Sequence, residues 1–174
     1  MRAIIIVLLG LMPLCAIAKG AEDMYIMWNH PSYKQYYVYE QTINKQRGGT
    51  PFAFVYDVTY ADSSQAVTYH FSITEPKMVT LDSIAFIVGD KQMTYPTPTP
   101  FYVDKVKKGW LHRYELSVLL TDWESMYQPD MPLVVVAYTP EGEVNYRVRS
   151  AAKWKKTCRR MQQIFDIIAL NKTF

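Results

Sequence analysis

Cysteine, histidine and glycine are all scarce in this chain of 174 residues. It holds two cysteines, Cys15 and Cys158, three histidines and seven glycines. Without Cys15, which lies beside a predicted cleavage site, the chain can form no intramolecular disulfide and no cysteine-cluster zinc site. The sequence contains no glycine-rich phosphate loop and no Gly-x-Ser-x-Gly motif. We therefore expect a fold stabilised by its core alone, with no cofactor and no bound metal ion.

The first residues have the pattern of a cleavable signal peptide. Arg2 supplies a positive charge, residues 3–14 are apolar apart from one glycine and one proline, and Ala16-Ile17-Ala18 ends the segment with small residues. The apolar run has about a dozen residues, fewer than the roughly 20 that span a membrane. We predict that residues 1–18 are removed. A retained anchor and a lipoprotein modified at Cys15 are the alternatives.

Residues 19–174 have the length of a single domain with a sizeable core. Hydrophobic residues make up 49% of the sequence, which argues against disorder. The net charge of +3 gives no case for nucleic acid as a partner. No later segment is long and apolar enough to span a bilayer. We expect one β-rich domain without a transmembrane segment, secreted or periplasmic and belonging to the cell envelope.

Apolar and polar side chains alternate in two adjacent segments, as they do in strands with one buried face. From Phe52 to Tyr60 the even positions are apolar or aromatic, and from Val67 to Thr74 the odd positions are apolar. Residues 61–65 form turns readily and join the two segments into a hairpin. Matching the apolar faces pairs Tyr60 with Val67.

A second hairpin and several further strands follow from similar patterns. Leu133–Tyr138 and Glu143–Arg149 flank Thr139-Pro140-Glu141-Gly142, whose proline and glycine favour a tight turn. The proline-rich residues 95–100 predict an extended connector outside the sheet, because proline lacks the N–H that a strand ladder needs. The remaining predicted strands are Tyr36–Ile43, Met78–Val88, Gln92–Tyr95, Phe101–Val106 and Trp110–Leu120.

Two helices are predicted. The short one begins after Thr121, where Glu124 completes a capping box. The long one covers about residues 151–170, with Ser150 as its N-cap and Asn171 as its C-cap. Its apolar stripe has a helical spacing of three or four residues. The residues of this stripe are Ala151, Trp154, Cys158, Met161, Phe165 and Ile168.

These elements together predict a mainly β (α+β) fold. We expect an antiparallel β-sandwich, or a strongly curled sheet, of about seven strands. The long C-terminal amphipathic helix would pack on this sheet and cover an open end or one face.

The candidates for catalysis are few. The hairpin register places Asp57 opposite His70 on the outer face, where a carboxylate could orient an imidazole as a base. A solvated cross-strand pair is the simpler interpretation, since no matching nucleophile accompanies the two residues. His112 alternates with apolar residues of its strand and is expected in the core. We therefore predict that Asp57 and His70 are neighbours without a catalytic role.

Aromatic residues cluster near the N-terminus and suggest a surface for ligands. Trp28, Tyr33, Tyr36 and Tyr37 are the candidate binding residues, because tyrosine and tryptophan combine a flat apolar face with a polar tip. Aromatic residues are also common in strands for packing reasons alone. The consecutive Tyr36 and Tyr37 must point to opposite faces of a strand, so at least one of them faces away from the core.

The sequence thus favours a small exported binding or accessory protein. The reason is a well-patterned fold that has no assembled catalytic set. Its partner would be a glycan, a peptide or another envelope protein. Two alternatives from other classes are a hydrolase-type enzyme that uses Asp57 and His70, and a structural or assembly subunit whose strand edges join to partners.

Overall fold

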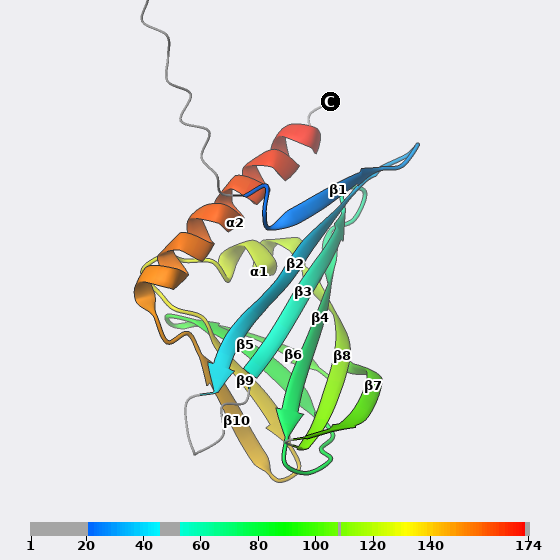
Figure 1. Ribbon diagram of the computed structural model, residues 1–174. Helices are drawn as coiled ribbons and strands as arrows, with labels where there is room; N and C mark the ends of the chain where they lie inside the picture. Colours follow the sequence, from blue (N-terminus) through cyan, green and yellow to red (C-terminus); the bar gives the residue numbers. More distant parts are fainter. Residues whose placement is uncertain (1–20, 46–52, 108, 173–174) are drawn as a thin grey trace, which may run out of the picture.

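The computed structural model describes residues 21–45, 53–107 and 109–172. The predicted signal peptide, residues 1–18, lies outside the described residues. Ten strands and two helices occur in the described part of the chain (Figure 1). They are β1 (Tyr25–Asn29), β2 (Lys34–Lys45), β3 (Ala53–Ala61), β4 (Ala66–Glu75), β5 (Ser83–Val88), β6 (Lys91–Pro96), β7 (Thr99–Val106), β8 (Gly109–Leu119), α1 (Leu120–Ser125), β9 (Val134–Thr139), β10 (Gly142–Arg147) and α2 (Ala151–Lys172).

All strand pairs are antiparallel, and they form one ladder in the order β6-β5-β9-β10-β2-β3-β4-β8-β7, with β1 paired to β2 outside this path. The ladder curls so that β5, β6 and β9 lie behind β3, β4 and β8 (Figure 1). Tyr69 of β4 and Phe86 of β5 pack across the interior with ring centroids 5.2 Å apart, although their strands are not ladder neighbours. The ladder is not a closed barrel, because β6 and β7 are its two open edges. The mainly β, antiparallel prediction is confirmed.

The number of strands exceeds the predicted value of about seven. The sequence did not predict β1, the strand that contains Trp28. Four of its five residues are exposed, so β1 lacks the alternating pattern that reveals a strand in the sequence. The predicted strand from Met78 is shorter, since β5 begins at Ser83.

The register of the first hairpin is confirmed. Tyr60 pairs with Val67 and Asp57 pairs with His70. The second hairpin is also present, and its strands pair from Thr139 and Gly142 onward. Burial of one face explains the first register, because a shift by one residue would expose the apolar side chains of β3 and β4.

The prediction that residues 95–100 lie outside the sheet is wrong at both ends. Pro96 ends β6 and Pro100 lies in β7, so only Thr97 and Pro98 connect the two strands. Both are edge strands, where a missing N–H can face away from the ladder without loss of a bond.

Helix α1 corrects the predicted capping box. It begins at Leu120, its N-cap is Leu119, and no side chain caps it, so Thr121 already lies inside the helix. Trp123 is its buried residue, and its ring packs on Phe165 of α2 with centroids 4.9 Å apart. Packing against the core, and not capping, therefore holds this short helix.

Helix α2 matches the long predicted helix and packs on the curled sheet. Ser150 caps it, since its Oγ accepts a hydrogen bond from Lys153 N at 3.3 Å. Two details differ: Ala151 is exposed, and Asn171 lies within the helix and is not its cap. Asn171 donates to the Tyr36 hydroxyl at 2.8 Å and accepts from Lys34 Nζ at 2.7 Å. These bonds fasten the end of the helix to β2.

The two helices together cover one end of the curled sheet (Figure 1). Tyr127, just after α1, stacks on Trp154 with centroids 5.6 Å apart. Its hydroxyl lies 3.1 Å from that of Tyr56 on β3. The helix residues that enter the core are Trp154, Cys158, Met161, Ile164, Phe165 and Ile168.

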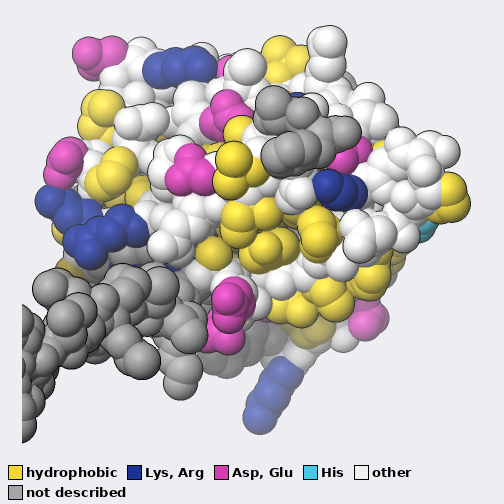
Figure 2. Space-filling view, turned by 90° about the horizontal axis from the view of Figure 1, so that it is seen from above, with side chains coloured by type: hydrophobic (Ala, Val, Ile, Leu, Met, Phe, Trp, Pro, Cys, Tyr) yellow, Lys and Arg dark blue, Asp and Glu magenta, His cyan; other side chains and the backbone are white. Residues whose placement is uncertain are grey.

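The outer side of α2 is basic. Lys155, Lys156 and Arg159 are exposed, and Lys155 pairs with Asp130 at 2.8 Å. Figure 2 looks down on the helical end, where Lys and Arg side chains gather at the left, the side on which α2 begins in Figure 1. Among the described residues, no helix is long and apolar enough to cross a membrane.

Candidate functional site

A polar cluster lies on the outer face of three neighbouring strands. The ladder sets Asp57 of β3 opposite His70 of β4, and His70 opposite Glu115 of β8. Arg113 stands two residues from Glu115 and is paired with Ser72. Since directly paired residues share a face and alternate residues return to it, all five side chains lie on the same side of the sheet. We call these five residues the polar cluster.

The cluster is joined by charge-assisted contacts. His70 Nδ1 lies 3.0 Å from Asp57 Oδ1, and His70 Nε2 lies 3.4 Å from Glu115 Oε2. Arg113 donates to Asp57 Oδ2 through Nη2 and to Ser72 Oγ through Nη1 at 3.3 Å. Asp57 is only 3% exposed although it lies on the outer face. Its neighbours therefore exclude water from it.

This geometry fixes charges in place but leaves no free base. Both carboxylate oxygens of Asp57 and both ring nitrogens of His70 already have partners. The hydroxyl of Ser72 contacts Arg113 and not His70. A nucleophile paired with a base would need a different arrangement. The cluster instead presents the guanidinium and imidazole in fixed positions next to an exposed Glu115.

Aromatic side chains flank the polar cluster on both sides. On one side Trp28 stacks on Tyr37 with centroids 6.4 Å apart, and Tyr37 meets Tyr39 edge to face at 5.8 Å. On the other side Phe101 of β7 meets the His70 ring at 6.3 Å, and Tyr102 lies beside it. We call Trp28, Tyr37, Tyr39, Phe101 and Tyr102 the aromatic band.

Most of the aromatic band is open to solvent. The exposed fractions are 47% for Trp28, 41% for Tyr39, 64% for Phe101 and 44% for Tyr102. Tyr37 is half-buried, and burial raises the pKa of its phenol, with the negative charge of Asp57 adding to the effect. Tyr37 therefore links the Trp28 side of the band to the polar cluster, as Phe101 does on the other side.

The ladder register places the band and the cluster on one continuous face. Trp28 is paired with Gln35, which stands two residues from Tyr37 on β2. Tyr37 is paired with Thr59, which stands two residues from Asp57 on β3. At the far edge Tyr102 is paired with Arg113. The face thus extends from β1 to β7 across six neighbouring strands.

Of the four candidate aromatic residues, the structure brings Trp28 and Tyr37 together on this face. Tyr36 is fully buried and points inward, as the opposite orientation of consecutive strand residues requires. Tyr33 stacks on His30 with centroids 4.4 Å apart, at the β1–β2 turn. Asp57 and His70 are neighbours, as predicted from the register.

The sequence analysis did not select five residues of this face. They are Arg113, Glu115, Phe101, Tyr102 and Tyr39, the last of which belongs to the N-terminal aromatic cluster. The signal for the first two was present, because they alternate with inward-facing residues on the predicted strand Trp110–Leu120. Phe101 and Tyr102 carry no such signal, since all but the last residue of β7 is exposed. His112 lies in the core as expected, fully buried, and burial lowers its pKa.

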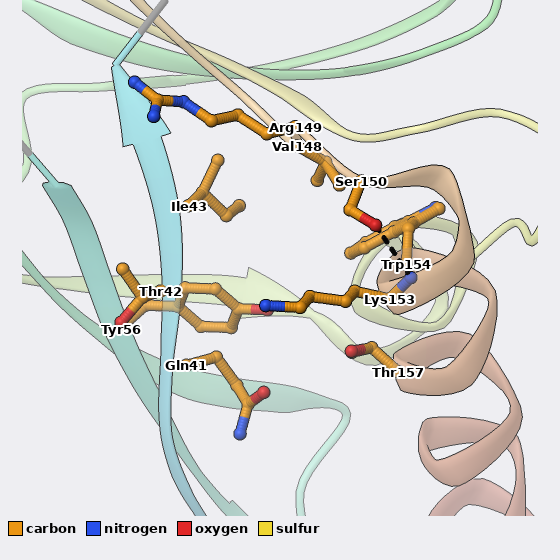
Figure 3. A pocket seen from close by; sticks show the side chains of 10 residues that line it. All are labelled: Gln41, Thr42, Ile43, Tyr56, Val148, Arg149, Ser150, Lys153, Trp154 and Thr157. Carbon is orange, nitrogen blue, oxygen red and sulfur yellow. Dashed lines mark hydrogen bonds between the residues drawn. The ribbon is translucent and has the colours of Figure 1, made fainter.

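A cavity of about 230 Å³ opens at the edge of β2, between the stretches that pair with β1 and with β10 and next to the start of α2 (Figure 3). Its lining comes from β2, β3, the segment before α2 and the first turns of α2. The lining residues are Gln41, Thr42, Ile43, Tyr56, Val148, Arg149, Ser150, Lys153, Trp154 and Thr157. None of them belongs to the polar cluster or to the aromatic band.

The described residues contain no group of three or more His, Cys, Asp or Glu side chains that could hold a metal ion. Comparison of the chain with family models, with curated proteins and with solved structures gives no match. The geometry alone therefore supports the functional argument.

Proposed function

We propose that this chain is an exported binding protein of the cell envelope whose outer sheet face recognises a glycan or a peptide. One observation carries the proposal: exposed aromatic side chains flank both sides of a fixed polar cluster on a single continuous face. Sugars and peptides both offer flat apolar surfaces next to hydrogen-bonding groups, which is the combination that such a face complements.

The placement of these residues on strands favours binding. Side chains on strands are held more precisely than those on mobile loops, and aromatic side chains lose little conformational entropy when a ligand covers them. Arg113 and His70 are already oriented by Asp57, so a ligand need not order them. An extended ligand lying across the strands could contact Trp28 and Phe101 at the same time.

Glycan and peptide arrays test this proposal. The chain from residue 19 onward should bind a defined subset of one array, and Trp28→Ala should weaken that binding. Met78→Ala is the matched control, because Met78 is also an exposed hydrophobic residue but lies outside the aromatic band. Absence of binding on both arrays, or an equal loss in the control, would speak against the outer face as a ligand surface.

A second candidate, an assembly subunit, is favoured by β7. This strand is an open edge of the ladder, and it exposes Phe101, Tyr102 and Val103 together. Such an edge can pair with a strand of another chain. Light scattering would then show a mass that rises with protein concentration, and Val103→Pro should return the mass to that of a single chain.

A further inference from the structure

The cavity beside α2 arises from the way β2 changes neighbours. The edge of β2 that faces away from β3 pairs with β1 up to Val38. It pairs with β10 from Asn44 onward. Between these points β2 contains an irregularity, and β3 is its only ladder neighbour among the described residues. The segment leaving β10 crosses this opening to begin α2. The backbone thus leaves a space that side chains frame but do not fill.

The floor of this cavity is apolar and partly aromatic. Ile43, Tyr56 and Trp154 are all nearly fully buried, and Val148 lies beside them. The indole N–H of Trp154 is engaged with the carbonyl of Gln128 at 2.9 Å, so this group is already satisfied. An aromatic or aliphatic body would therefore contact this floor without leaving a buried donor unpaired.

The rim of the cavity is basic. Arg149 and Lys153 both line it, and no acidic residue does. In Figure 3 the side chain of Lys153 extends from α2 across the cavity toward β2, and Arg149 extends toward the end of β2. Among the described residues, Lys153 Nζ has no hydrogen bond or ion pair, whereas Lys155 on the same helix pairs with Asp130. The Lys153 charge thus extends over the cavity and has no carboxylate partner in the described part of the chain.

We propose that this cavity binds a small aromatic carboxylate, whose ring lies on the apolar floor and whose anion faces Lys153. The volume of about 230 Å³ is below the range of about 300–1,000 Å³ typical of drug-sized ligands, which limits the ligand to roughly one ring with a short arm. Threonine and glutamine side chains at the rim, Thr42, Thr157 and Gln41, supply further polar contacts. The site shares no residue with the polar cluster or the aromatic band, and its test is independent of the proposed function.

Phenylacetate is the probe for this site, and NMR titration is the measurement. The indole N–H signal of Trp154 should shift with saturable binding, in the low-millimolar range or tighter for a ligand of this size. Lys153→Gln should weaken the binding at least about fivefold, since it removes the unpaired charge. Lys156→Gln is the control, because Lys156 is an exposed lysine of the same helix that does not line the cavity.

Comparison with phenylacetamide distinguishes the contribution of the negative charge from that of the aromatic ring. It should bind at least about fivefold more weakly than phenylacetate, because it has the same shape without the anion. The proposal is overturned if the Trp154 signal does not saturate at about 20 mM phenylacetate. Equal affinity in Lys153→Gln, or equal affinity for the neutral probe, would also overturn it.

Discussion

Asp57 is the residue on which the outer face depends. It is nearly fully buried, and its two oxygens bind His70 and Arg113. A carboxylate in such surroundings stabilises the fold only while its partners compensate for the lost hydration. The contact between Arg113 and Asp57 therefore has two effects. It orients the Arg113 side chain, and it compensates the buried negative charge of Asp57.

Replacement of Arg113 by glutamine should lower the free energy of unfolding by about 2–4 kcal/mol, because it removes the guanidinium that compensates the buried carboxylate of Asp57. Urea denaturation measures the change. Arg147→Gln, at an exposed strand position, should change stability by less than about 0.5 kcal/mol. Adding Asp57→Asn to the Arg113 variant should recover part of the loss, and no recovery would contradict the assigned pairing.

His112 makes folding stability sensitive to acid. Burial holds its pKa below the ordinary value of 6.5, so between these two values the unfolded chain binds a proton that the folded chain does not. Stability should therefore fall as the pH drops below about 6.5, with a slope of at most about 1.4 kcal/mol per pH unit from this residue. His112→Gln should remove that part of the slope. Parallel stability curves for the two proteins between pH 5 and pH 7.5, measured by urea denaturation, would refute the assignment.

At the scale of elements, α2 is the part that completes the core. Its buried residues meet α1 and Tyr127, and Asn171 fastens its far end to β2. A chain that ends at Arg149 should lose cooperative thermal unfolding. Burial of Trp154, Met161 and Phe165 is worth roughly 1.5–3 kcal/mol each, which together approaches the 5–15 kcal/mol stability of a typical domain. A truncated chain that still melts sharply would show that the helix serves a partner instead.

Cys158 reports on the same helix without truncation. Its thiol is buried, and burial raises its pKa to about 11, so the reactive thiolate is rare at neutral pH. In a Cys15→Ser variant, which leaves one thiol, a disulfide reagent should label the native protein slowly and the denatured protein at once. Rapid labelling of the native protein would indicate that α2 detaches from the sheet.

At the scale of the whole molecule, the sequence was informative wherever one face is buried and the other is not. The pairing of Tyr60 with Val67 and the stripe of α2 both follow from such asymmetry, and so does the placement of Asp57 beside His70. The peripheral strands β1 and β7 lack this asymmetry between a buried face and an exposed face. β1 and β7 are exposed on nearly all residues, so their sequences contain no period of two.

The candidate site could be predicted only in part for the same reason. Trp28 and Tyr37 stood out as part of an aromatic cluster, whereas their position relative to Arg113 depends on the order in which strands pair. The strand order brings Tyr37 and Arg113, about 75 positions apart in the sequence, onto one face with β3 and β4 between them. Local sequence patterns do not reveal this order. Phe101 reaches the same face only because β7 pairs with β8.

Calorimetric titration of the array-selected ligand into Trp28→Ala, Phe101→Ala and the double variant tests the outer face as a single binding surface most directly. Each exposed aromatic residue contributes about 1 kcal/mol or more if a ligand covers it, so each single change should weaken binding at least about fivefold. The double variant should lose about the product of the two factors, because the two residues lie at opposite sides of the polar cluster. Unchanged affinity in both single variants would contradict a ligand surface that spans β1 to β7.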